Sequence, residues 1–357
     1  MSFILFLFIL GLLIIVHEFG HFLAAKKMGV KVEKFALGFG PALWKIKKGD
    51  TEYSLCAIPL GGYVKMAGDS IQEHKGASDE YLSRPPLQRA LIIFLGPLLN
   101  YLLGFLCFWM IFILGYPALT TKVGGVIEGL GAKEAGIQAG DRISAIDGKR
   151  LVLWEELQKA IQGKKDSSAR VLITRGDKEY ELDVRITEKK MEDLLGGEHK
   201  VGLLGITPVD EFVQVRHGFF KAAFLSARKT LDLTLITYKA LSRMVTGRLS
   251  MRESVTGPLG IFFITSKAAR LGFIAVMHLV AVLSISLAIF NLLPLPVLDG
   301  GHILLLGIEK LRKRPFGPKT EHVITQAGLA LIILLAVVAT YNDLLRFFGD
   351  KIFSFLK

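Results

Sequence analysis

The sequence has 357 residues, of which 51% are hydrophobic, and its formal net charge is +12 at pH 7. The apolar residues form long blocks, which indicates a membrane protein; soluble proteins spread them to fit amphipathic periods. Most Lys and Arg residues lie beside these blocks, where basic residues anchor membrane helices, and no nucleic-acid motif accompanies them. Nucleic-acid binding is therefore not expected, and two cysteines without a Cys-x-x-Cys spacing predict neither a disulfide framework nor a cysteine zinc site.

Four apolar segments are long enough to cross a bilayer, which takes about 20 residues. They run over residues 3–25, 90–114, 273–293 and 327–341. The first lacks the basic start of a signal peptide and contains ionisable residues, so we expect a retained helix. The predicted fold class is a polytopic α-helical membrane protein.

Basic residues near the ends of these segments predict their orientation. One cluster follows the first segment, and another lies between the third and the fourth. By the positive-inside rule both loops are cytoplasmic, so residues 115–271 and both termini lie on the outer side. The clusters comprise Lys26, Lys27, Lys31, Lys34, Lys45, Lys47 and Lys48, and Lys310, Arg312, Lys313, Arg314 and Lys319.

Residues 17–21 read His-Glu-Phe-Gly-His, the HExxH pattern of zinc-binding helices. Helix positions four apart share a face, so His17 and His21 reach one metal ion, and Glu18 lies beside it as a general base. Ionisable groups at membrane depth are costly unless they are paired or bind a metal. The alternative is a solvated helix end, which accounts for a charge but not for two histidines on one face.

A hydrolytic zinc site usually takes three protein ligands. Asp299 is the one acid in or near the third apolar block, and it follows Pro294 and Pro296, which break the helix. Irregular backbone at membrane depth is tolerated where it lines a cavity or is buried in protein. We therefore predict Asp299 as the third ligand, with a helix-end cap as the alternative. The ligand types favour zinc over another divalent metal.

Together these residues resemble the site-2 protease family of intramembrane zinc metalloproteases, of the regulator-of-sigma-E-protease type. That family pairs HExxH with a later NxxPxPxLDG, and residues 291–300 here read Asn-Leu-Leu-Pro-Leu-Pro-Val-Leu-Asp-Gly. Further matches are Gly-Phe-Gly-Pro at 38–41, Pro-Leu-Gly-Gly-Tyr-Val-Lys-Met at 59–66 and Gly-Pro-Leu-Leu-Asn at 96–100. The resemblance spans essentially the whole chain.

The resemblance implies a water activated by zinc, with Glu18 as base and Asp299 as third ligand. It also implies that Asn291 holds an unwound substrate helix, and it favours an active-site role for Asn100 over glue between helices. Gly61 and Gly62 complete the candidate substrate-binding residues, together with Asn291 and Asn100.

The resemblance further implies a multi-pass protein of the bacterial inner membrane that acts in regulated intramembrane proteolysis. Its substrates would be single-pass membrane proteins, such as anti-sigma factors trimmed by another protease, or leftover signal peptides. Membrane lipid is the other expected partner. A PDZ-bearing adaptor without catalysis is the alternative, against which the intact Glu18 argues.

Between residues 31 and 66, short apolar–polar runs alternate with glycines, which predicts a membrane-associated β-hairpin region. Its edge could pair with an extended substrate by strand addition, or the segment could be an ordinary cytoplasmic hairpin.

Residues 124–185 read as strands and one helix, with a tight Asp-Gly turn at 147–148. They are similar to an α+β PDZ domain, whose A-G-[IL]-x-x-G-D signature appears at 135–141. Such a domain binds an extended peptide or a chain end. Relatives of this type carry two in tandem, whereas this chain has room for one. We expect four segments: a first membrane half (1–114), an extracytoplasmic PDZ domain (115–210), an amphipathic helical region (211–271) and a second membrane half (272–357).

Overall fold

The computed structural model describes residues 2–164, 167–192, 197–250, 255–314 and 316–355. The chain divides into two compact units. The membrane unit comprises Met1–Ile111, Ala222–Leu241 and Ser250–Lys357, and the inserted unit comprises Phe112–Lys221 and Ser242–Leu249. The four-segment division drawn from the sequence, with limits at 114, 210 and 271, stays a proposal.

Four helices of the described residues have the length and composition to cross a membrane. They are α1 (Ser2–Lys27), α2 (Pro86–Leu114), α8 (Phe273–Asn291) and the part His322–Phe348 of α10 (Pro318–Phe355). The predicted polytopic fold class is confirmed. The third predicted span was too long, because α8 ends at Asn291 and the prolines that follow cannot continue the hydrogen-bonded ladder.

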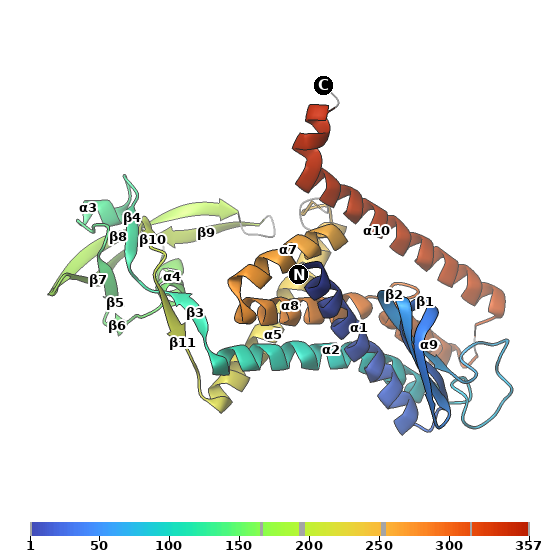
Figure 1. Ribbon diagram of the computed structural model, residues 1–357. Coiled ribbons are helices and arrows are strands. Elements are labelled where there is room, and N and C mark those ends of the chain that lie inside the picture. Colours follow the sequence, from blue (N-terminus) through green and yellow to red (C-terminus); the bar gives the residue numbers. More distant parts are fainter. Residues whose placement is uncertain (1, 165–166, 193–196, 251–254, 315, 356–357) are drawn as a thin grey trace. The chain divides into compact units, whose positions relative to one another are not determined.

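Among the described residues, three further helices belong wholly or largely to the membrane unit (Figure 1): α5 (Phe219–Val245), α7 (Pro258–Leu271) and α9 (Asp299–Arg312). The segment 211–271, expected to be helical, begins instead with the short strand β11 (Phe212–Val215). Helix α7 starts with proline at its first position, where the missing N–H costs nothing.

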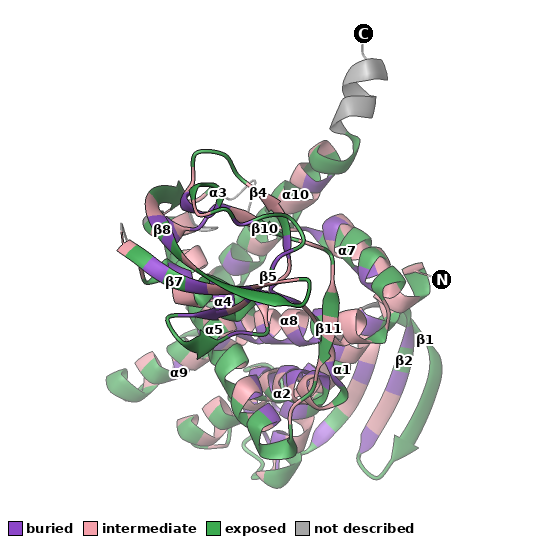
Figure 2. Ribbon diagram, turned by 90° about the vertical axis from the view of Figure 1, so that its left-hand side faces the viewer, coloured by how far each residue is buried: buried purple, intermediate pink, exposed green. Residues whose placement is uncertain are grey.

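The membrane helices approach one another closely at glycines. A Cβ atom on Gly20 of α1 would lie 2.3 Å from the carbonyl oxygen of Leu95 in α2. A Cβ atom on Gly104 of α2 would lie 2.5 Å from Ile285 in α8. Small residues permit such contacts, which drive helix association where lipid removes the hydrophobic effect. The buried faces of α1, α2 and α8 meet at the centre of this unit (Figure 2).

The strands β1 (Val32–Lys48) and β2 (Thr51–Met66) form more than a simple hairpin, because both bend sharply. Phe35 pairs with Tyr53 on one side and with Val64 on the other, while Ile46 also pairs with Tyr53. The two strands therefore make four runs, in the order 62–66, 32–39, 51–58 and 42–48, in which the outer two pairings are antiparallel and the central one, between 32–39 and 51–58, is parallel. Within the described residues, the run 62–66 is an edge of this sheet. It packs beside α1 (Figure 1).

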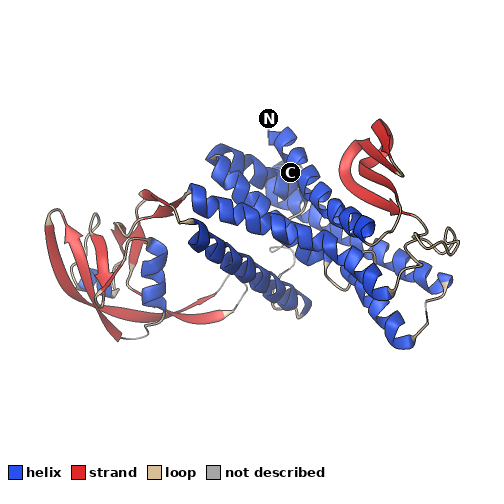
Figure 3. Cartoon of the chain, turned by 90° about the horizontal axis from the view of Figure 1, so that it is seen from below, coloured by secondary structure: helices blue, strands red, loops and turns tan. Residues whose placement is uncertain are grey.

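The inserted unit is an α+β domain whose strands form one main sheet and two short pairs (Figure 3). The main sheet has the order β6-β5-β7-β8-β9, and the pairs are β10-β4 and β11-β3. Its elements are β3 (Tyr116–Leu119), β4 (Val123–Val126), α3 (Gly131–Glu134), β5 (Arg142–Ile146), β6 (Lys149–Arg150), α4 (Trp154–Gln162), β7 (Ser167–Arg175), β8 (Lys178–Glu192), β9 (Glu198–Leu203) and β10 (Ile206–Pro208).

The predicted Asp-Gly turn of this unit is confirmed. Asp147 and Gly148 both have positive φ, 48° and 78°, as a two-residue hairpin between β5 and β6 requires. The core is a single cluster of buried apolar residues, and Leu157 of α4 and Val171 of β7 lie within it. The predicted inserted α+β domain of the PDZ type is thereby part of the confirmed fold class.

Asp141, in the PDZ signature, forms a two-point ion pair that joins the start of β5 to the end of the neighbouring strand β7. Arg175 Nε and Nη2 donate to the two carboxylate oxygens, each at 2.7 Å, and the backbone N–H of Gln138 donates at 2.8 Å. Burial opposes ionisation of this carboxyl, but the hydrogen bonds from Arg175 and Gln138 hold its pKa below its ordinary value.

We expect Asp141→Asn to destabilise the inserted unit by about 2 kcal/mol, since hydrogen bonds to charged groups contribute about 1.5 to 3 kcal/mol. Hydrogen exchange of the β5 and β7 amides in the full-length protein measures this loss. Because the folded pKa is depressed, the contribution is complete above about pH 4, the ordinary carboxyl value, and is lost as pH falls further.

The matched control is Glu155→Gln. Glu155 pairs with Lys159 at 2.7 Å on the exposed face of α4, and such pairs contribute about 0.5 kcal/mol or less. Equal losses in the two variants would contradict a special role for Asp141.

Candidate metal centre

Helix α1 presents His17 and His21 on one face, and both are buried, at 8% and 9% exposure. Asp299 comes from the opposite end of the sequence, as the first residue of α9. Between α8 and α9 the chain turns through residues 292–298, where Val297 has a φ of 78°. This left-handed conformation is strained for a β-branched residue and is typical of functional sites.

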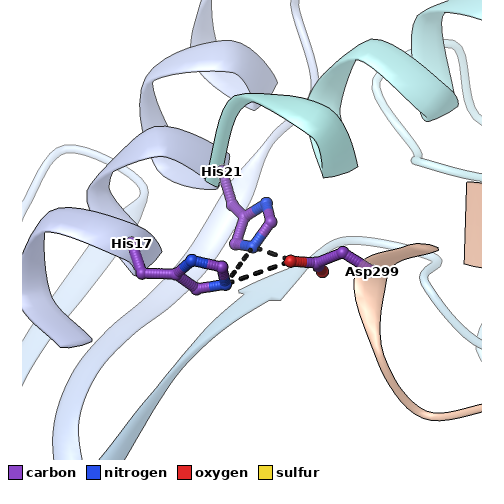
Figure 4. Close-up of side chains that lie close together, drawn as sticks. All are labelled: His17, His21 and Asp299. Carbon is purple, nitrogen blue, oxygen red and sulfur yellow. Dashed lines mark hydrogen bonds and ion pairs between the residues drawn. The ribbon is translucent and has the colours of Figure 1, made fainter. Parts of the chain in front are cut away.

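The three side chains converge, as Figure 4 shows. The Nε2 atoms of His17 and His21 are 3.3 Å apart. The carboxylate of Asp299 lies with Oδ2 at 3.1 Å from His17 Nε2 and with Oδ1 at 3.6 Å from His21 Nε2. Asp299 Oδ2 is buried and has no hydrogen-bond partner among the described residues.

These spacings are compatible with a zinc ion. Ligand atoms about 2.0 to 2.1 Å from a tetrahedral ion are about 3.3 to 3.4 Å from one another. The two Nε2 atoms, 3.3 Å apart, match that value, and the contacts of 3.1 and 3.6 Å, which involve different oxygens of Asp299, lie on either side of it. A nitrogen–nitrogen–oxygen donor set with one carboxylate oxygen left unpaired is the chemistry of a three-ligand site with a position for water.

Helix α2 contacts both imidazoles. His21 Nδ1 lies 3.0 Å from the carbonyl oxygen of Ile92, so Nδ1–H donates to it and Nε2 is left with its lone pair. His17 Nδ1 lies 3.4 Å from the side-chain amide of Asn100, which has no exposed surface.

Gly96, between these two contacts, makes room for the rings. A Cβ atom there would lie 2.4 Å from His21 Nε2 and 3.1 Å from His17 Cε1. Sequence reasoning had matched Gly96 only as the first residue of the Gly-Pro-Leu-Leu-Asn run at 96–100, without a link to metal binding.

The edge of the β1–β2 sheet lies against Glu18. A Cβ atom on Gly62 would lie 3.1 Å from Glu18 Cγ, so glycine permits this approach. At the neighbouring Gly61, φ is 117° and a Cβ atom would lie 2.1 Å from the ring of Phe39. Gly61 is therefore required by its left-handed backbone, whereas Gly62 leaves only tight room for a side chain and lies beside the predicted base.

Asn291, the last residue of α8, also reaches the centre. Its Nδ2 lies 3.4 Å from His17 Nε2, and the residue is partly exposed. The structure thus brings together His17, His21, Asp299, Asn291 and Asn100, with Glu18 next to them on α1.

A cavity of about 330 Å³ within the membrane unit opens beside the ligands. His21 and Asp299 line one part, and the ion pair between Arg89 and Glu309, 3.4 Å apart, lines another. Burial raises the pKa of the Tyr81 hydroxyl in its wall well above the ordinary range. His302, one turn after Asp299, faces this cavity and was not part of the predicted site.

Two of the solved structures that match this chain are small domains. The PDZ domain of an SdrC-like protein from Listeria monocytogenes is 28% identical and covers 27% of this chain and 90% of that chain, with a TM-score of 0.21. A PDZ domain from Listeria innocua is 26% identical over 26% of this chain and 96% of that chain, also with a TM-score of 0.21.

Curated relatives match over nearly the whole chain. A protein of Agrobacterium fabrum, whose name assigns it provisionally to the zinc metalloproteases, is 33% identical and covers 96% of both chains. The regulator of sigma-W protease of Bacillus subtilis is 28% identical, over 97% of this chain and 98% of its own. The protease RseP of Yersinia pestis is 28% identical, over 96% and 98%. The alignments with the Bacillus and Yersinia proteins run over 425 and 445 positions, so both relatives contain segments that this chain lacks.

The model of Peptidase family M50 matches residues 5–335. This match covers the ligands on α1, the inserted unit and the turn before α9. The predicted resemblance, the zinc-dependent enzyme class and a bacterial inner-membrane protein are all supported by these findings. The chain belongs to Peptidase family M50, the site-2 protease family of zinc metalloproteases.

Proposed function

We propose that this zinc metalloprotease cuts a peptide bond within the transmembrane segment of single-pass membrane proteins. The observation that carries the proposal is the meeting of His17, His21 and Asp299 among helices of membrane-spanning length. Metal ligands buried on helices long enough to cross a membrane are expected of an intramembrane peptidase and not of a soluble one.

We assign the metal to His17, His21 and Asp299. When bound, zinc supplies a Lewis acid and makes a water molecule acidic enough to react at neutral pH. The two histidines hold their Nε2 lone pairs toward one point, and the carboxylate of Asp299 faces both.

Glu18 is the proposed general base. It accepts a proton from the attacking water and returns it to the amine that leaves, which makes both products neutral at the moment of bond breakage. Its place beside the ligands and against Gly62 supports this role, because a peptide along that sheet edge passes the carboxylate.

The substrate strand is proposed to add to the run 62–66, the edge of the β1–β2 sheet. A helical peptide bond is shielded, so it must be extended before attack, and an open strand edge supplies the backbone hydrogen bonds that the unwound segment needs. Asn291, whose amide lies 3.4 Å from His17 Nε2, is positioned to donate to a substrate carbonyl.

The proposed substrates are proteins that control a sigma factor after another protease has shortened them, or remnant signal peptides. The name of the Bacillus relative, a regulator of sigma W, supports the first class. The inserted unit is proposed to lie outside the cytoplasm, where a PDZ domain would bind a peptide or a chain end and filter substrates.

Glu18→Gln is expected to lower the cleavage rate by a factor of about 10² to 10⁴ while zinc stays bound, because only the base is removed. The assay uses a tagged single-pass substrate with a shortened outer part in bacterial membranes, with metal content measured on the same sample. Glu33→Gln, at an exposed position of β1, is the matched control and should cut normally. A wild type that holds zinc but leaves several such substrates whole would favour the adaptor function.

Gly96→Ala is expected to lower zinc affinity at least about tenfold, because the new Cβ atom displaces the ligand imidazoles. Competition with a metal chelator measures this affinity. Gly307→Ala in α9 is the control, since a Cβ atom there meets nothing within 4 Å. The same affinity in both variants would argue against the close approach of α2 to the metal centre.

Cysteine labelling tests the proposed orientation. In a chain with Cys56→Ala and Cys107→Ala, a membrane-impermeant maleimide added to cells with a permeable outer envelope should label Lys149→Cys in β6. It should not label Lys47→Cys in β1 until the inner membrane is opened, because that position lies within the basic cluster proposed to be cytoplasmic. The reverse pattern would overturn the orientation.

A further inference from the structure

We propose that Asn100 is a positioning residue for the metal: its side-chain oxygen accepts the Nδ1–H of His17 and so directs the Nε2 lone pair of His17 at the ion. This inference rests on the proposed zinc site. It gives Asn100 a role distinct from the substrate contact that the sequence suggested.

The position of the proton on the His17 ring decides which atom of the Asn100 amide must face it. A neutral imidazole carries one proton, so ligation through Nε2 requires that proton on Nδ1, and Nδ1–H then needs an acceptor. Asn100 is the group that the structure provides, 3.4 Å away. If the amide nitrogen faced Nδ1, it would donate to that atom, and the ring proton would lie on Nε2, where the metal must bind.

Either orientation of the Asn100 amide leaves one of its buried polar atoms without a partner, so the partner that His17 requires decides between them. The side-chain oxygen and nitrogen of asparagine occupy nearly the same positions, so their assignment follows from hydrogen bonding. With the nitrogen toward His17, Oδ1 is buried and has no partner among the described residues. Exchanging the two atoms moves the unpaired position to the nitrogen and pairs the oxygen with a donor. The requirement of His17 therefore settles the orientation.

The other histidine ligand supports this assignment, because it is already held in the same way. His21 Nδ1–H donates to the carbonyl oxygen of Ile92 at 3.0 Å. Ile92, Gly96 and Asn100 follow one another at four-residue spacing along α2, so they share one face. That face supplies an acceptor for each ligand, with a glycine between them where the rings need space.

Asn100 is also rigidly held and inaccessible. The residue has no exposed surface, and Ser284 of α8 donates its hydroxyl to the Asn100 carbonyl oxygen at 2.8 Å. A side chain so enclosed is suited to orienting a neighbour and poorly suited to meeting a substrate. Groups that orient a ligand histidine typically change metal affinity by about 10- to 100-fold when removed.

The test compares Asn100→Leu, which cannot accept a hydrogen bond, with Asn100→Asp, which can. Full-length protein in detergent is titrated with zinc against a chelator of known affinity, and the melting temperature is measured in excess chelator. We expect Asn100→Leu to bind zinc about 10- to 100-fold more weakly and Asn100→Asp to stay within about threefold of wild type or to bind more tightly. Ser284→Ala, which leaves the amide in place, is the control and should retain its zinc.

The outcomes are distinct. If Asn100→Leu folds and keeps the zinc affinity of wild type, this inference is wrong while the zinc site stands. If Asn100→Leu fails to fold, Asn100→Asp decides alone: its carboxylate can accept Nδ1–H of His17, so a zinc affinity at or above that of wild type supports the inference and a large loss of zinc overturns it. Absence of zinc from the wild type would overturn the metal site, and this inference with it.

Discussion

The burial of three polar ligands inside a bundle of apolar helices is the constraint on which the rest of this structure depends. His17, His21 and Asp299 lie where lipid and apolar side chains offer no hydrogen bonds, so each is costly unless it meets the others or a metal. Their mutual separations of 3.1 to 3.6 Å leave little freedom. The position of α1 against α2, and of the turn before α9 against both, must therefore be held within a fraction of an ångström.

Small residues and irregular backbone allow α1, α2 and the turn before α9 to come this close together. Gly20 allows α1 to touch the backbone of α2, and Gly96 leaves room for the imidazoles between them. The turn between α8 and α9 brings Asp299 back toward α1, at the expense of a strained Val297. Packing among the helices must compensate for this strain, and the buried faces of α1, α2 and α8 provide the contacts.

The interactions that stabilise the β1–β2 sheet and the inserted unit differ from those that hold the helix bundle together. In β1 and β2, two strands fold into four runs and leave one edge beside Glu18, where backbone groups rather than side chains would meet the proposed substrate strand. The inserted unit has its own apolar core and an ion pair, Asp141 with Arg175, that does not depend on the helices.

The membrane spans, the HExxH helix and the meeting of His17, His21 and Asp299 were predictable from the residues alone, because they follow from local composition, helical periodicity and the types of ligand that zinc takes. The α+β insertion and its Asp-Gly turn were indicated in the same way. The folded chain was needed to reveal that Gly96 must be small, that Asn100 is enclosed against His17, and that the hairpin region is a four-run sheet with Gly62 at its edge. These features depend on contacts between residues far apart in the chain, and neither propensity nor periodicity carries information about which helix face or strand edge a distant segment will meet.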